Sequence, residues 1–181
     1  MGKKRHIIDL PQLPAGINVI DTHCHLDMMG SEDEISTAIN RAAASGVAPI
    51  ITVGIDLESS KKAIRLASNC SMPKVVAYGE IGLDYVKQYA PNDVQLEHYA
   101  RQVDLAKKMQ LPVVIHDREA HDDILSILNE KAPFSAGGVM HCFSGDWHLA
   151  QKVLDMGFII SIPGVVTFNK ATSMQEVAQK I

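Results

Sequence analysis

Four histidines and one glutamate in this sequence stand at or just beyond the ends of short apolar runs. Two histidines follow the first run with one residue between them, a spacing that places both side chains on one face of a strand. Neutral imidazole is the commonest metal ligand in proteins, and a carboxylate in apolar, glycine-flanked surroundings needs a partner or a metal ion. Any one of these histidines could be a hydrogen-bonded structural residue, but the repeated position favours a joint metal site. The predicted ligands are His23, His25, Glu80, His116 and His141.

Such a centre would catalyse hydrolysis. A carboxylate between two histidine pairs can bridge two divalent ions, which lower the pKa of bound water and polarise a substrate oxygen. A phosphoester, a lactone or an amide would be a natural substrate. The reaction also needs a general base, for which no clear candidate stands out beyond Asp84. Asp21 and Asp84 are candidates for groups that orient the ligands.

Arg118 lies two residues beyond His116, on the same side if the strand continues that far. A guanidinium there could bind a phosphate or a carboxylate through two parallel hydrogen bonds. The alternative is a salt bridge to a nearby acidic residue, namely Asp84, Asp117 or Glu119. The sequence leaves both interpretations open.

Alternating apolar runs and amphipathic stretches must position these residues. The runs lie at residues 17–20, 50–53, 75–78, 113–115, 139–140 and 158–162, and each precedes a stretch with helical periodicity. Capping boxes at Ser31/Glu34 and Ser173/Glu176 predict where the first and last helices begin. Strand–helix alternation predicts a parallel sheet with its site at the carboxyl ends of the strands.

We therefore expect one α/β domain over residues 1–181, with about six strand–helix units. A complete (β/α)₈ barrel needs about 250 residues, so the sheet would be either open or an incomplete barrel. The remaining histidines, His6, His98, His121 and His148, are expected to be surface or capping residues, and Cys24 and Cys142 small core residues.

Composition narrows the class of protein. The chain is 46% apolar with a net charge of −4, which predicts a globular fold without the strong basic field of a tight nucleic-acid binder. Three cysteines without a C-x-x-C motif argue against a disulfide framework. No apolar stretch approaches the roughly 20 residues of a membrane span. We expect a cytoplasmic protein with no membrane partner.

Four segments resemble the TatD family of metal-dependent deoxyribonucleases. They occur in the family's order at residues 21–27 (DTHCHLD), 79–85 (GEIGLDY), 111–116 (LPVVIH) and 141–145 (HCFSG). The resemblance implies a TIM-barrel metallohydrolase that trims DNA ends with two divalent metal ions. Magnesium or manganese would serve in an assay, although imidazole ligands also suit zinc, iron or nickel. It further implies His23 and His25 on one ion, His116 and His141 on the other, Glu80 bridging them, and Arg118 on a phosphate.

The sequence departs from the family pattern in two places. Family members have a strand ending in Gly-Ile-His-Pro before the second motif, whereas here residues 70–73 run almost directly into Val75. They also have a late strand ending in Glu-Thr-Asp, whose aspartate binds metal and acts as the base, whereas this sequence stops at Ile181, before that strand. We thus expect an incomplete barrel whose unpaired strand edges favour self-association. DNA or another phosphodiester is the expected substrate; the alternatives are a small-molecule amidohydrolase or lactonase and a non-catalytic metal-binding fragment.

Overall fold

A computed structural model describes residues 13–14, 16–68 and 75–181 of the 181-residue chain. These residues form two compact units, which meet in the sequence between Leu66 and Ala67. The single domain expected over residues 1–181 stays a prediction.

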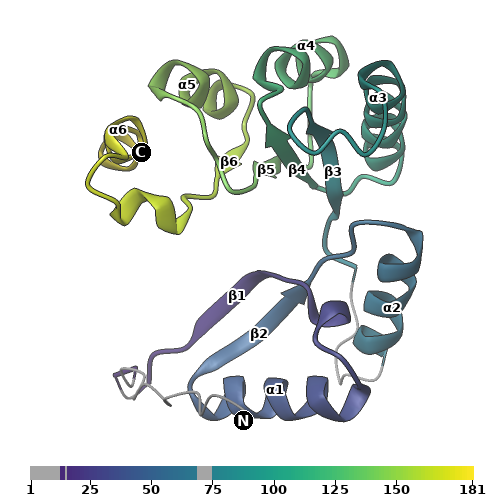
Figure 1. Ribbon diagram of the computed structural model, residues 1–181, viewed down its shortest axis with the longest axis vertical. Coiled ribbons are helices and arrows are strands. Elements are labelled where there is room, and N and C mark those ends of the chain that lie inside the picture. The colour runs from purple at the N-terminus through teal and green to yellow at the C-terminus, as the bar shows by residue number, and fades with distance from the viewer. Residues whose placement is uncertain (1–12, 15, 69–74) are drawn as a thin grey trace, which may run out of the picture. The chain divides into compact units, whose positions relative to one another are not determined.

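The N-terminal unit is a pair of parallel strands with a helix after each (Figure 1). Its buried apolar side chains are few: Leu26, Ile35, Val53 and Ala63. Strand β1 leaves Val19 and Ile20 40% and 55% exposed, so side chains on both of its faces reach solvent. The elements are β1 (Val19–Cys24), the 3-10 helix η1 (Leu26–Met28), α1 (Glu32–Ala44), β2 (Val47–Thr52) and α2 (Leu57–Ser68).

Helix α1 begins as its sequence predicts. The Ser31 side chain accepts a hydrogen bond from the Glu34 backbone N–H, and the Glu34 carboxylate accepts one from the Ser31 N–H at 2.8 Å. This reciprocal capping box satisfies two of the N–H groups left over at a helix start. Ile35 in the first turn is 1% exposed, so it packs α1 into the core of the N-terminal unit. Gly46 follows the C-terminal end with φ +82°, a conformation that glycine adopts without strain.

The C-terminal unit is a four-stranded parallel sheet whose strands lie in chain order, β3-β4-β5-β6 (Figure 1). Helices follow β3, β4 and β5 directly, which is the strand–helix alternation that the sequence predicts. The elements are β3 (Tyr78–Asp84), α3 (Asn92–Lys108), β4 (Val113–Arg118), α4 (His121–Lys131), β5 (Gly138–Met140), α5 (Trp147–Asp155), β6 (Ile159–Ile160), the 3-10 helix η2 (Gly164–Thr167) and α6 (Thr172–Lys180).

One hydrophobic cluster holds this unit together. Alternate residues of β3 and β4 enter it, because successive side chains of a strand point to opposite faces. Leu83 and Ile115 are fully buried in this cluster, together with Tyr99 of α3 and Leu128 of α4. The other face of the same two strands carries polar side chains: Glu80, Asp84, His116 and Arg118. These polar side chains therefore point away from the hydrophobic core.

Two details differ from the sequence-based expectation. The strand predicted at 75–78 begins only at Tyr78 and continues to Asp84, while Val75 and Val76 are exposed. The last helix begins at Thr172 with Ala171 as its N-cap, so the predicted Ser173/Glu176 capping box is wrong. Ser173 already lies inside the first turn, where its hydroxyl is not in the capping position.

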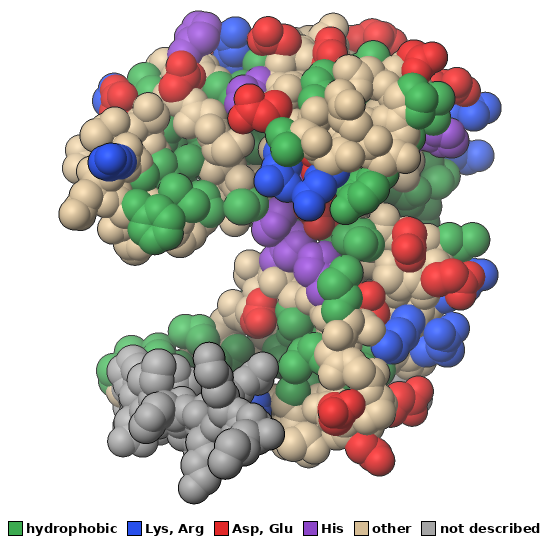
Figure 2. Space-filling view, in the orientation of Figure 1, with side chains coloured by type: hydrophobic (Ala, Val, Ile, Leu, Met, Phe, Trp, Pro, Cys, Tyr) green, Lys and Arg blue, Asp and Glu red, His purple; other side chains and the backbone are tan. Residues whose placement is uncertain are grey.

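The outer surfaces of the helices are mixed in charge. On the visible face of Figure 2, α2 and α3 carry both acidic and basic side chains, in keeping with a net charge of −4. Within the part of the chain that the structure describes, no helix combines the length and hydropathy needed to cross a membrane.

Candidate metal centre

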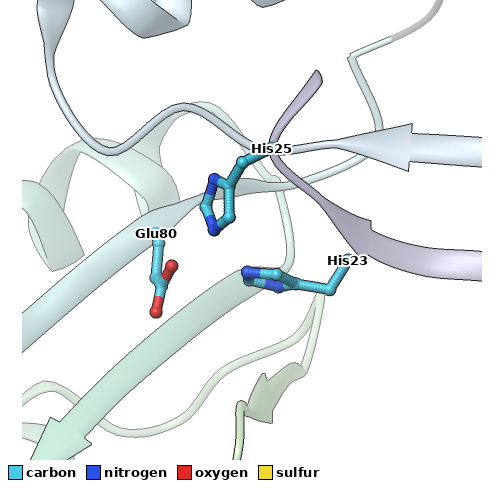
Figure 3. A group of neighbouring side chains, drawn as sticks. All are labelled: His23, His25 and Glu80. Atoms are coloured by element: carbon cyan, nitrogen blue, oxygen red, sulfur yellow. The ribbon is translucent and has the colours of Figure 1, made fainter. Parts of the chain in front are cut away.

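His23 and His25 form a pair in the N-terminal unit. His23 lies in β1 and His25 comes directly after the strand, one residue beyond Cys24. Their ring centroids are 5.1 Å apart and the rings meet edge to face (Figure 3). Asp21, two residues earlier, accepts a hydrogen bond from the His23 backbone N–H at 3.2 Å. The H-x-H spacing therefore brings two imidazoles to one place, as the sequence predicts.

The orientation of the His25 ring suits a metal ligand. Its Nδ1 lies 3.0 Å from the carbonyl oxygen of Val53, at the end of β2. A carbonyl can only accept, so Nδ1 carries the proton and the neutral ring keeps a lone pair on Nε2. Metal-binding histidines commonly donate their second ring N–H to a backbone carbonyl in this manner.

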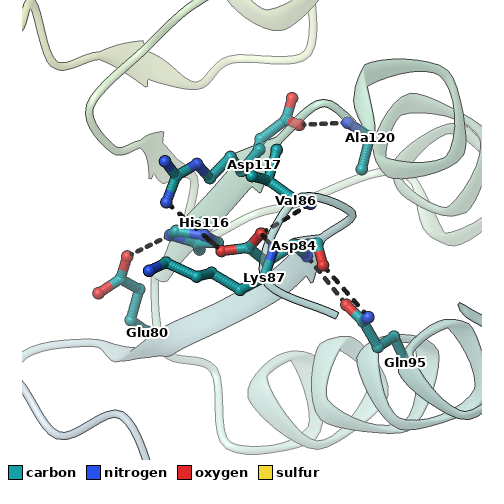
Figure 4. A network of polar contacts seen from close by, with 9 residues as sticks. Glu80, Asp84, Val86, Lys87, Gln95, His116, Asp117 and Ala120 are labelled. Atoms are coloured by element: carbon teal, nitrogen blue, oxygen red, sulfur yellow. Dashed lines mark hydrogen bonds and ion pairs between the residues drawn. The ribbon is translucent and has the colours of Figure 1, made fainter. Parts of the chain in front are cut away.

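Glu80, Asp84 and His116 form a hydrogen-bonded network in the C-terminal unit (Figure 4). His116 Nδ1 lies 2.9 Å from Glu80 Oε1, and His116 Nε2 lies 3.2 Å from Asp84 Oδ2. Arg118 Nη1 is 4.0 Å from the same Asp84 oxygen, at the outer limit of an ion pair. Arg118 therefore shares the His116 side of β4, as predicted. Glu80 projects from within β3 rather than beyond its end (Figure 3).

A glycine allows β3 and β4 to approach closely at this network. Gly82 pairs with His116 across the two parallel strands. Its φ is +150°, and a Cβ built on it would lie 1.8 Å from the His116 carbonyl oxygen. Any larger residue at this position would force the backbone of His116 to move. Gly82 is therefore needed for the close packing of β3 against β4, in addition to being part of the sequence motif around Glu80.

Asp84 is itself held by its surroundings. Its Oδ1 accepts hydrogen bonds from the N–H groups of Val86 and Lys87, at 3.0 and 2.7 Å. The Gln95 side chain of α3 accepts from the Asp84 N–H at 2.9 Å and donates to the Asp84 carbonyl at 3.3 Å. It also donates to the carbonyl of Ala90 at 2.8 Å. Sequence reasoning did not find Gln95, because one glutamine on the polar side of a helix gives no distinguishing signal.

The network has defined electrostatics. The hydrogen bond to Glu80 raises the pKa of His116; burial opposes this rise, and Asp84 adds to it. Burial would raise the pKa of Asp84, but hydrogen bonds from the Lys87 N–H, His116 and the Val86 N–H together lower it. Glu80 and Asp84 thus favour a positively charged His116 ring. A divalent cation could replace that proton on a nitrogen and bind the same carboxylates, so the imidazole and carboxylate donors fit a metal ion.

His141 comes immediately after β5, the neighbour of β4. Its backbone N–H donates to the Ile115 carbonyl at 2.9 Å, and Ile115 pairs with Met140. His116 and His141 therefore occupy equivalent positions on adjacent strands. The C-terminal unit brings Glu80, His116 and Arg118 into one network and places His141 on the next strand; the ligand roles of these residues stay predictions.

Two residues outside the predicted set differ from expectation. His121, expected at the surface or as a cap, is hydrogen-bonded through Nδ1 to the buried carboxylate of Asp117 at 2.6 Å. Cys142, expected in the core, is exposed with φ +46°, while Cys24 is half-buried. Both thiols are free, and Cys70 lies outside the described residues.

Comparison with known proteins points to one family. The family described as "TatD related DNase" matches residues 20–72 and 68–181. The chain is 32% identical to the uncharacterized metal-dependent hydrolase YabD of Bacillus subtilis, covering 90% of this chain and 75% of that protein. It is 30% identical to YcfH of Escherichia coli, also an uncharacterized metal-dependent hydrolase, over 90% and 73%. The two matched stretches overlap at residues 68–72, close to the place where the sequence departs from the family pattern.

Solved structures give the same result for the fold. The chain resembles the crystal structure of YJJV, a TatD homologue from Escherichia coli, with a TM-score of 0.78 and 28% identity over 90% of this chain and 74% of that one. An uncharacterized amidohydrolase from Saccharomyces cerevisiae shares the fold, with a TM-score of 0.74 at 18% identity over 91% and 72%. These similarities confirm the predicted α/β fold of the TIM-barrel type.

Proposed function

The chain belongs to the family of TatD-related DNases, a family of metal-dependent hydrolases, and on this basis we propose that it hydrolyses phosphodiester bonds at DNA ends with two divalent metal ions. The observation that carries the proposal is the Glu80–His116 hydrogen bond of 2.9 Å with Arg118 on the same strand face. These residues combine an imidazole and a carboxylate, which can bind a cation, with a guanidinium, which can bind an anion. That combination suits a phosphodiester better than a neutral lactone or amide.

His23, His25, Glu80, His116 and His141 would hold the ions, with Glu80 shared between them. When bound, such ions acidify a water molecule and stabilise the charge that develops on the phosphate oxygens. The Val53 carbonyl orients the His25 ring by accepting a hydrogen bond from its Nδ1. Asp84 acts as a positioning residue, because its two oxygens already accept from His116 and from two backbone N–H groups.

Arg118 would bind the phosphate of the scissile bond. Its side chain is 48% exposed and lies 4.0 Å from Asp84, so the pair is loose enough for the guanidinium to turn toward a substrate. Planar guanidinium groups match two phosphate oxygens at once. Arg118→Lys would keep the charge but lose this bidentate geometry, and we expect it to raise KM more than it lowers kcat.

The decisive experiment measures bound metal and nuclease activity together. The native protein should bind divalent metal, detected by mass spectrometry, and release nucleotides from end-labelled single-stranded DNA in manganese. Replacing both His23 and His25 with alanine should strip metal and abolish release. His98→Ala, an exposed histidine of α3, is the matched control and should behave as the native protein does.

Two outcomes would contradict the proposal. Unchanged metal content in the double variant would show that the histidine pair does not bind metal. Hydrolysis of small lactone or amide substrates, with DNA left intact by a metal-loaded protein, would instead support the small-molecule hydrolase alternative.

A further inference from the structure

A pocket of about 410 Å³ lies within the C-terminal unit, among the first turns of α4, α5 and α6. Its volume falls within the usual range for small-molecule sites, about 300–1,000 Å³. Two leucines that line it, Leu125 and Leu149, are only 6% and 7% exposed and provide an apolar floor. Polar side chains complete the lining: His121, Asp122, Ser144, Asp146, His148, Lys152 and Ser173.

One of these polar groups is fixed in orientation. The Nδ1 of His121 lies 2.6 Å from Asp117 Oδ2, and the Asp117 side chain is 4% exposed. The other Asp117 oxygen accepts from the Ala120 N–H at 3.3 Å, so this carboxylate is anchored to the start of α4. A carboxylate can only accept, so Nδ1 carries the proton. With Nδ1 as the donor, the second ring nitrogen, Nε2, is the one that faces a ligand, and in the neutral tautomer it is a hydrogen-bond acceptor.

This dyad lies apart from the candidate metal ligands. Asp117 directly follows His116 in β4, but successive strand residues point to opposite faces. His116 contacts Glu80 and Asp84, whereas Asp117 contacts His121 at the beginning of the next helix. The pocket nevertheless lies at the same carboxyl edge of the strands, because α4 follows β4 and α5 follows β5. A ligand in this pocket would therefore lie at the same edge of the sheet as the predicted metal ligands but would not occupy the proposed metal site.

The charges on the pocket wall are separated. The α5 side carries His148 and Lys152, and purple and blue side chains gather over this helix at the upper left of Figure 2. The acidic Asp146 on the same side is already engaged as the α5 N-cap, accepting from the Leu149 N–H at 2.9 Å. The α4 side carries the Nε2 acceptor of His121 and the exposed carboxylate of Asp122. Lys152 therefore offers a cation on the α5 side, and His121 Nε2 offers an acceptor to a hydrogen-bond donor on the α4 side.

We propose that this pocket binds a nucleotide, as the subsite for the terminal nucleotide of the DNA substrate or for the mononucleotide released. The inference rests on the proposed nuclease function and names the part of the substrate that this region recognises. The base lies over Leu125 and Leu149, a sugar hydroxyl donates to His121 Nε2, and the phosphate lies beside Lys152. Inorganic phosphate alone would leave the apolar floor unused, and an apolar ligand would leave the polar groups without partners.

The test is a titration of deoxyadenosine monophosphate into the native chain with EDTA present, followed by two-dimensional NMR. We expect saturable binding that is tighter than that of deoxyadenosine or of inorganic phosphate. His121→Ala and Lys152→Ala should each weaken it about fivefold to tenfold, the loss expected for one hydrogen bond or charge contact. His121→Gln keeps an acceptor on a side chain of similar reach and should recover part of the affinity. His98→Ala and Lys108→Ala, two exposed residues of α3, are the matched controls and should change nothing.

Several results would overturn the subsite. These are undetectable binding at millimolar nucleotide, equal binding by native protein and both pocket variants, or inorganic phosphate competing as well as the nucleotide. Binding that the His23/His25 double variant abolishes while His121→Ala leaves it intact would place the nucleotide elsewhere. The proposed nuclease function fails separately, if DNA is not hydrolysed with manganese although nucleotide binding depends on His121.

Discussion

The N-terminal unit buries four apolar side chains among its described residues, whereas the C-terminal unit buries nineteen in one cluster. Both units carry histidines predicted to bind metal, but they hold them differently. His25 is oriented by a backbone carbonyl in a two-stranded unit with a small core. His116 is oriented by two carboxylates on a four-stranded sheet with helices packed on its other face. Substitutions should therefore act through packing in the C-terminal unit and through local hydrogen bonds in the N-terminal one.

The largest effect is expected from the core of the C-terminal unit. Leu128 of α4 is fully buried, so Leu128→Ala should lower the free energy of unfolding by about 2–5 kcal/mol, measured by urea denaturation. Leu105→Ala, in a neighbouring helix at a position 43% exposed, is the control and should cost under about 1 kcal/mol. Similar losses in the two variants would mean that this cluster does not carry the stability assigned to it.

The second-largest effect is expected from Gly82→Ala, a substitution that should disturb both the packing of the sheet and the candidate site. The added Cβ would lie 1.8 Å from the His116 carbonyl oxygen, on a backbone with φ +150°. We expect a loss of about 2–4 kcal/mol, from overpacking together with backbone strain. Metal affinity should fall as well, because His116 must shift. Gly164→Ala, whose Cβ would meet open space, should leave both the denaturation midpoint and the metal content unchanged.

Gln95→Ala tests the network without touching a predicted ligand. It removes three hydrogen bonds that hold the backbone of Asp84 and the carbonyl of Ala90. The expected cost is about 1–3 kcal/mol in unfolding free energy. If Gln95 positions Asp84 for His116, the NMR titration curve of the His116 ring in metal-free protein should also move; an unchanged curve would restrict Gln95 to a structural role.

The smallest effect should come from the helix start in the N-terminal unit. Ser31→Ala removes the α1 capping box and should cost about 1 kcal/mol by thermal denaturation. Ser173→Ala is the natural comparison, because the sequence places a capping box there and the structure does not. It should leave the midpoint unchanged, and a loss equal to that of Ser31→Ala would restore the sequence-based interpretation.

The order and type of the elements could be predicted because apolar runs and helical periodicity are local signals. The capping box at Ser31 was found for the same reason, since its two partners are three residues apart. The shift of β3 from 75–78 to Tyr78–Asp84 could not be foreseen. Its pairing with β4 is set by Gly82 opposite His116, a contact between residues far apart in the sequence.

The candidate site shows the same division. The motif residues were visible in the sequence, and Asp84 was suspected of orienting a ligand. The Gln95 contacts with Asp84 and the Asp117–His121 dyad were not found, because each depends on how a helix lies against a strand end. His121 looked like a capping residue at the start of a helix, and only the burial of Asp117 distinguishes it.

The bond between His25 and the Val53 carbonyl has a consequence for how the protein tolerates genetic variation. The acceptor belongs to the main chain, so an apolar substitution of Val53, whose side chain is only 6% exposed, leaves it in place. His116 depends on two side-chain carboxylates, each of which a single missense change can delete. Apolar substitutions at position 53 should therefore leave the orientation of His25 unchanged, whereas substitutions at Glu80 or Asp84 should disturb that of His116. A library of random single variants, scored for retained metal, would record that asymmetry directly.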